Sequence, residues 1–187
     1  MFRFAVVATL LLASPTVFAA GPAVGDAAPA VTTKDIKGRE VVVPAPGKVM
    51  VLALVAKATG DKAGEVTKEV RVAHPDVEVV TFIDASGFPG FLGGMVKSKI
   101  SGRHDQAVKD NNEAFKKAGK TPPDDMDKRV HLVPVMDGKI VQNQYGAKDT
   151  DKQAHFVVVG ADGKIAATFD KTPTAADVNA ALDKLPK

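Results

Sequence analysis

Residues 49–74, VMVLALVAKATGDKAGEVTKEVRVAH, decide the fold. The opening run, residues 49–55, is apolar without alternation, which is typical of a central strand covered on both faces. A short polar loop, residues 56–61, leads directly into an amphipathic helix, and a second apolar strand follows at residues 77–83. A strand–helix–strand unit of this length predicts a parallel pair with a right-handed crossover. The apolar stripe predicted for the helix consists of Val66, Val70 and Ala73.

Turn residues and hydrophobic periodicity predict the remaining elements. Gly38 tolerates the tight turn of a hairpin over residues 31–43, and Gly163 does the same for a second hairpin near the C-terminus. A helix is predicted over residues 104–118, with Val108, Phe115 and Ala118 on its inner side and Gly119 directly after it. Strands are predicted over residues 131–136, 155–159 and 164–169, and a last helix is capped by Thr174. Together these elements predict an α/β fold, in which a mixed sheet is flanked by helices on both faces and preceded by an N-terminal β-hairpin.

The N-terminus has the features of a secretory signal peptide. Arg3 supplies a positive charge, residues 4–13 are apolar, and Val17 and Ala19 stand where a signal peptidase reads small residues. The apolar run is shorter than the roughly 20 residues of a spanning helix. We therefore expect residues 1–19 to be removed and residues 20–187 to form one domain. The expected location is the periplasm or the exterior, with neither a transmembrane segment nor a lipid anchor.

Composition excludes some classes of function. The chain has 25 Lys and Arg against 22 Asp and Glu, spread among one another, so no basic surface for nucleic acid is expected. One Tyr and no Trp leave few platforms for base stacking. The sequence contains no cysteine, so it can form no disulfide and perform no thiol chemistry.

Several short sequence motifs, in the same order along the chain, resemble those of thioredoxin-fold proteins of the peroxiredoxin and redoxin (AhpC/TSA-like) branch. Residues 24–29, VGDAAP, are similar to the V-G-D-x-A-P opening of those proteins, and residues 75–80 to the segment after their active-site helix. Residues 144–146 and 156–165 resemble their closing phrases. The chain is also similar to the YtfJ-type exported family, which has a comparable T-x-x-K stretch. This resemblance implies a thioredoxin-like fold over nearly all of the mature chain.

The sequence differs from that family at the residues that carry the family's redox chemistry. Thioredoxins keep C-x-x-C and peroxiredoxins T-x-x-C where this chain has residues 59–62, TGDK, so Lys62 stands at the peroxidatic position. Gln153 or Ala154 replaces the cis-proline that faces a thioredoxin's redox site. Thiol peroxidase and disulfide oxidoreductase activities are therefore not expected, no catalytic residue is assigned, and no cofactor is expected.

The start of the first helix is the candidate ligand site. Free N–H groups, a hydroxyl and an ammonium converge there and could hold a peptide, a protein partner or a small anion. The competing interpretation is a helix capped by a Thr or Asp oxygen, followed by a solvated lysine. A third alternative is a non-redox enzyme with Lys62 as nucleophile. The candidate residues are Thr59, Gly60, Asp61, Lys62 and Glu65.

A Gly-rich apolar loop, residues 87–95, is the candidate partner contact. Its large side chains either fold inward onto the core or form an exposed patch for a protein or peptide partner. In the second case the protein is an assembly or structural component. Because the loop follows a parallel strand, we expect it at the same end of the sheet as Thr59. The contact residues are Phe88, Phe91, Leu92 and Met95.

No metal site is predicted. The four histidines lack metal-type spacing, although His131 and His155 lie on predicted strands and could meet in the sheet. Asp124, Asp125 and Asp127 crowd one loop without the spacing of a calcium-binding loop, and are interpreted as a solvated acidic loop.

Overall fold

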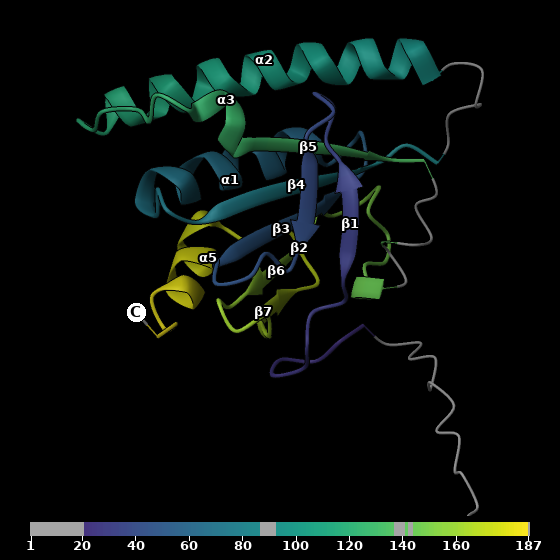
Figure 1. Cartoon of the computed structure of the whole chain (residues 1–187), viewed down its shortest axis with the longest axis vertical. Coiled ribbons are helices and arrows are strands. Elements are labelled where there is room, and N and C mark those ends of the chain that lie inside the picture. The colour runs from purple at the N-terminus through teal and green to yellow at the C-terminus, as the bar shows by residue number, and fades with distance from the viewer. Residues whose placement is uncertain (1–20, 87–92, 137–140, 142–143, 187) are drawn as a thin grey trace, which may run out of the picture.

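The computed structural model describes residues 21–86, 93–136, 141 and 144–186 (Figure 1). A five-stranded mixed sheet has the order β5-β4-β3-β6-β7, and a separate antiparallel hairpin pairs β1 with β2. The strands are β1 (Val31–Lys34), β2 (Glu40–Val43), β3 (Met50–Val55), β4 (Glu78–Asp84), β5 (Val130–Val135), β6 (His155–Val159) and β7 (Ile165–Phe169). The helices are α1 (Gly60–Ala73), α2 (Gly93–Lys117), α3 (Met126–Arg129) and α5 (Ala175–Leu182).

Strand β3 is the centre of the fold. It runs parallel to β4, as predicted, and antiparallel to β6, and all of its residues are buried. Successive side chains of a strand point to opposite faces. One set, with Val51 and Val55, packs beneath α1 and α5, and the other, with Leu52, packs beneath the β1–β2 hairpin. The apolar run without alternation is therefore explained by cover on both sides, and the predicted fold class is confirmed.

Helix α2 lies beside α1 and along the edge strand β5 (Figure 1). It starts at Gly93, earlier than the predicted His104. Ile100 packs with Ala85 near its beginning and Phe115 with Met126 near its end. Because α2 meets both α1 and β5, it closes one side of the space above the sheet.

Three sequence-based expectations are wrong in detail. Ala73 is exposed, and Ala63 instead joins the buried stripe of α1, because the helix rests on the sheet through its earlier turns. Ala118 follows α2 and is exposed. His131 and His155 do not meet, because β4 and β3 lie between their strands.

The predicted helix ends are confirmed at two positions. Gly119 has a φ of 70°, the left-handed conformation expected after a helix. Thr174 caps α5 in a capping box, in which its hydroxyl accepts from the backbone N–H of Asp177 and the Asp177 carboxylate accepts from the Thr174 N–H. Within the described ranges, no helix combines the length and apolarity needed to cross a membrane. The predicted signal peptide lies outside the described residues.

Candidate functional site

Thr59 occupies the position before α1, but its hydroxyl does not cap the helix. The hydroxyl accepts a hydrogen bond from the backbone N–H of Ala56 (3.0 Å) and donates to the backbone oxygen of Thr150 (2.8 Å). The expected side-chain cap is therefore wrong, because the oxygen points into the protein, where loop backbone groups need partners. Thr59 instead ties the β3–α1 loop to the segment before β6.

The other candidate residues at this end of α1 do not converge on one point. The exposed carboxylate of Asp61 lies 3.5 Å from a guanidinium nitrogen of Arg103 on α2, and Glu65 forms an ion pair with Lys68. Lys62 is exposed. Gly60, Asp61 and Glu65 line a cavity beside α1, whereas Lys62 is not among the residues that line it.

The cavity lies between α1, α2 and the strands beneath them, and has a volume of about 290 Å³. Its floor is mostly apolar and comes from alternate residues of the parallel strands, and its walls are the facing sides of the two helices. The floor residues include Val55, Thr81, Ile83, Val130 and Leu132. The wall residues include Gly64, Thr67, Lys68 and Arg71 from α1, and Arg103, Gln106, Ala107, Asp110 and Asn111 from α2.

Arg71 is the unusual wall residue. It is 5% exposed, and a terminal guanidinium nitrogen donates to the backbone oxygen of Val79 at 3.3 Å. Its Nε is buried and has no hydrogen-bond partner among the described residues. Burial lowers the pKa of the Arg71 guanidinium to about 10, so the group stays positively charged at neutral pH. No described carboxylate forms an ion pair with it, whereas Lys68 and Arg103 each have one.

A second wall residue, Asn111, also has an unused polar atom. Its Nδ2 donates to the backbone oxygen of Ala107 at 2.7 Å. Its Oδ1 is buried and finds no partner in the described part of the chain. Arg71 and Asn111 therefore each have one polar atom that is enclosed by protein and has no partner among the described residues.

Arg71 is not among the site residues predicted from the sequence. A signal was available, because Arg71 is four residues after Thr67 and eight after Ala63, on the buried face of α1. A charged residue at a core position of an amphipathic helix is rarely buried without a partner.

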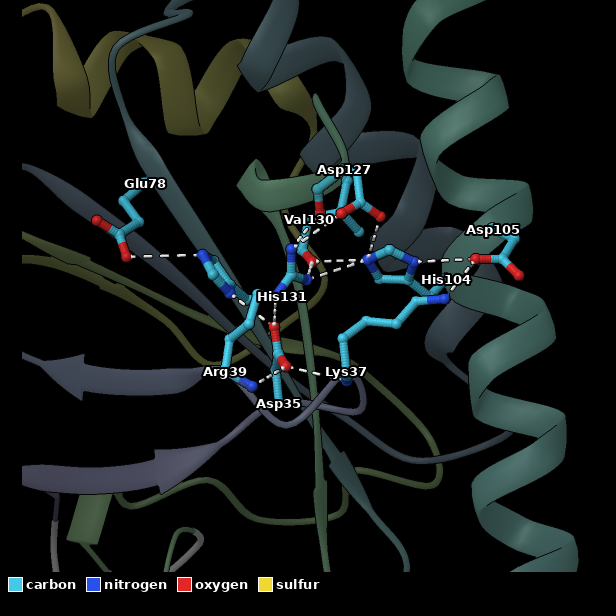
Figure 2. A network of polar contacts seen from close by, with 9 residues as sticks. All are labelled: Asp35, Lys37, Arg39, Glu78, His104, Asp105, Asp127, Val130 and His131. Atoms are coloured by element: carbon cyan, nitrogen blue, oxygen red, sulfur yellow. Dashed lines mark hydrogen bonds and ion pairs between the residues drawn. The ribbon is translucent and has the colours of Figure 1, made fainter. Parts of the chain in front are cut away.

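A polar network links the hairpin to the sheet edge (Figure 2). The buried carboxylate of Asp35 accepts from Arg39 Nε at 2.7 Å and lies 3.1 Å from His131 Nδ1. Arg39 extends to the ring of His104 on α2 and to the backbone oxygen of Val130. Burial alone would raise the pKa of Asp35, but the hydrogen bonds from the Arg39 backbone, His131 and the Arg39 side chain outweigh it and lower the pKa. The network holds β1–β2 against β5 and α2, which is a structural role.

The aspartates of the predicted acidic loop serve local ion pairs. Asp125 pairs with Arg129, and Asp127 lies 3.3 Å from Arg39. In the described part of the chain, no group of three or more His, Cys, Asp or Glu is placed to hold a metal ion.

The predicted partner contact falls largely outside the described residues, which omit Phe88, Phe91 and Leu92. Met95 belongs to α2, and its side chain is likewise outside the description. That interface remains a prediction.

Comparisons with known proteins identify the fold. No protein-family model and no curated protein matches the chain. Solved structures do match it. The exposed lipoprotein thioredoxin Etrx1 from Streptococcus pneumoniae is 15% identical, with 84% of this chain and 100% of that one covered and a TM-score of 0.54. A DsbF homologue from Corynebacterium diphtheriae is 15% identical, with 95% and 100% covered and a TM-score of 0.52.

A third match is a secreted Mycobacterium tuberculosis disulfide oxidoreductase homologous to Escherichia coli DsbE, 15% identical over 83% of this chain and 96% of that one, with a TM-score of 0.51. Likeness at these identities shows the fold alone. The chain has a thioredoxin-like fold, and its sequence contains no cysteine.

Proposed function

We propose that this is an exported thioredoxin-fold protein that has no redox thiol and works by binding a small anion in the cavity between α1 and α2. The observation that carries the proposal is Arg71, a buried cation beside the cavity with no acidic partner in the described residues. The predicted signal at residues 1–19 supports export, as does the likeness to an exposed lipoprotein thioredoxin and to a secreted disulfide oxidoreductase.

The physical argument concerns the free energy of an unpaired buried charge. Moving a charged group out of water costs several kcal/mol, and this penalty is offset only when a counter-charge and hydrogen bonds replace the lost hydration. A guanidinium presents its N–H groups in a planar fork that matches a carboxylate or a phosphate. An anion in the cavity that accepts from the Arg71 guanidinium would supply the missing counter-charge.

The cavity also explains how part of the predicted site contributes. Gly60, Asp61 and Glu65 line its mouth, and the ion pairs of Asp61 and Glu65 occupy the outer cations Arg103 and Lys68. Among the described residues that line the cavity, Arg71 is the cation without an ion pair. Lys62 is exposed and outside the cavity lining, which makes it a suitable control.

Isothermal titration calorimetry with acetate, 4-methylpentanoate and inorganic phosphate tests the proposal. Arg71→Met keeps a long apolar side chain in place of the cation and should weaken binding by about 30-fold or more, since loss of one partner of a buried charge pair costs about 2–5 kcal/mol. Lys62→Ala should leave the affinity within about twofold. Equal binding by wild type and Arg71→Met, or no binding of any of these anions, would refute the proposal.

The absence of redox chemistry has its own test. Peroxide consumption with thioredoxin supplied as reductant should not exceed the rate in buffer, because the sequence has no sulfur nucleophile of the required kind. A catalysed rate that scales with protein concentration would contradict a binding role without redox activity.

A further inference from the structure

The cavity has a charged end and an apolar end, and the sheet beneath it fixes the distance between them. The Arg71 guanidinium donates to the backbone oxygen of Val79, which marks the charged end. Ile83 follows on the same face of β4 and lines the cavity. Because a strand rises about 3.3 Å per residue, Ile83 lies roughly 13 Å beyond Val79. A ligand held by Arg71 therefore has room to extend along the floor.

The floor at the second end is apolar and incompletely covered by the helices. Ile83 is paired with Val55 of β3, and Leu132 of β5 is paired with Thr81. Ile83 is only half-buried, although β4 is an interior strand of the sheet. An aliphatic chain in the cavity would remove this apolar surface from water, which is favourable.

A glycine in the wall formed by α1 keeps this part of the cavity open. Gly64 lines the cavity and precedes Arg71 by about two helical turns, roughly 10 Å at about 1.5 Å per residue. Glycine is unfavourable inside a helix. A Cβ at this position would meet no described atom within 4 Å, so packing does not require glycine here. The missing side chain instead leaves room between α1 and the floor.

The charges of the lining favour a ligand with a single negative charge. Three cations and three carboxylates line the cavity, namely Lys68, Arg71, Arg103, Asp61, Glu65 and Asp110. A carboxylate beside Arg71 is balanced by that residue. A second anionic group farther along would approach Asp61 and Glu65, whose cationic partners are already paired, and would be repelled.

We propose that the cavity binds a singly charged, unbranched aliphatic carboxylate, the class of medium-chain fatty acids. The carboxylate lies beside Arg71, and the chain runs along β4 toward Ile83. At about 30 Å³ for each water-sized group, the volume of about 290 Å³ takes roughly ten non-hydrogen atoms, the size of octanoate. This inference rests on the proposed anion-binding function and adds the length and charge of the ligand.

The test is a series of acids titrated into the wild-type protein by calorimetry. The probes are butanoate, hexanoate, octanoate, dodecanoate and octanedioate. Affinity should rise about fourfold for each methylene up to octanoate and level off before dodecanoate, because further methylenes stay in water. Octanedioate, which has the same chain length as octanoate and a second carboxylate, should bind at least about tenfold more weakly.

A matched pair of variants locates the chain in the cavity. Gly64→Leu should weaken octanoate binding at least about tenfold and leave butanoate within about twofold, because the new side chain fills the part of the cavity distant from Arg71. Ala73→Leu introduces the same residue at an exposed position of α1 outside the cavity lining, and should change neither affinity by more than about twofold. The wild-type series stands on its own if Gly64→Leu does not fold.

The outcomes separate this inference from the proposed function. Equal affinity for butanoate and octanoate, octanedioate that binds as tightly as octanoate, or a folded Gly64→Leu that binds octanoate like wild type would overturn the fatty-acid assignment and leave the anion site intact. Failure of every acid and of inorganic phosphate to bind would overturn both.

Discussion

Substitution of Asp35 by Asn tests how the N-terminal hairpin is held to the sheet. The Oδ1 atom of Asp35 accepts from the backbone N–H groups of Lys37 (3.0 Å) and Arg39 (2.9 Å). Its Oδ2 accepts from Arg39 Nε at 2.7 Å and lies 3.1 Å from His131 Nδ1. Asn can keep the two backbone bonds, but it places an NH2 group where Oδ2 faced two donors.

The expected loss follows from these contacts. A hydrogen bond to a charged group contributes about 1.5–3 kcal/mol, and a neutral one about 1 kcal/mol. Arg39 is partly exposed and can turn toward water, so the larger estimates for a fully buried pair do not apply. We expect the free energy of unfolding to fall by about 3 kcal/mol at pH 7.

The pH dependence provides a second signature. The folded-state pKa of Asp35 is lower than that of the unfolded chain, so the stabilisation is present above the ordinary carboxyl pKa of about 4 and is lost as pH falls through the folded value. The gap between wild type and Asp35→Asn should therefore be full at pH 7 and narrow below about pH 4.

Urea unfolding followed by far-UV circular dichroism at pH 7 and pH 3 measures both effects. Asp124→Asn is the matched control, because it removes the same charge from an exposed side chain. A variant within about 0.5 kcal/mol of wild type at pH 7, or a gap that is the same at both pH values, would refute the role assigned to Asp35.

Two further predictions concern the loop before α1 and the end of α2. Thr59→Val should lower the free energy of unfolding by about 2 kcal/mol, because the hydroxyl's hydrogen bonds with the Ala56 N–H and the Thr150 oxygen are lost. The exposed Lys62→Ala should change it by less than about 0.5 kcal/mol, and equal urea midpoints would contradict this. Gly119→Ala should destabilise the folded protein by about 1–2 kcal/mol, because the φ of 70° at this position strains any residue that has a Cβ. Gly102→Ala, inside α2, should instead stabilise the protein by up to about 1 kcal/mol. Thermal melts in which both variants shift the melting temperature in the same direction would exclude this explanation.

The mixed sheet and its parallel β3–β4 pair could be predicted because the relevant signals are local, whereas the order of the strands across the sheet was not predicted. The uninterrupted apolar run of β3 indicates cover on both faces, and the helix that follows it requires a parallel partner. The capping residues around Thr174 likewise act within one turn. Such signals do not depend on what lies far away in the chain.

The start of α2 could not be predicted in this way. Gly93, Gly94 and Gly102 have low helix propensity, so the local pattern favours a later beginning. Tertiary packing of Ile100 against Ala85 stabilises the early turns instead.

The candidate site could likewise be predicted only in part. The position of residues 59–62 at the start of a helix was predictable, but the direction of the Thr59 hydroxyl depends on Thr150, which is distant in sequence. The cavity exists because α2 stands beside α1, and only that packing reveals that Arg71 and Asn111 share it.

The resonance of Arg71 Nε–H in a proton–nitrogen correlation spectrum, assigned by its disappearance in Arg71→Met, tests the central claim most directly. Titration with 4-methylpentanoate should move this resonance along a saturable curve as the carboxylate binds beside the guanidinium. An Nε–H signal that stays in place up to the highest ligand concentration would contradict the claim that this buried guanidinium binds an anion.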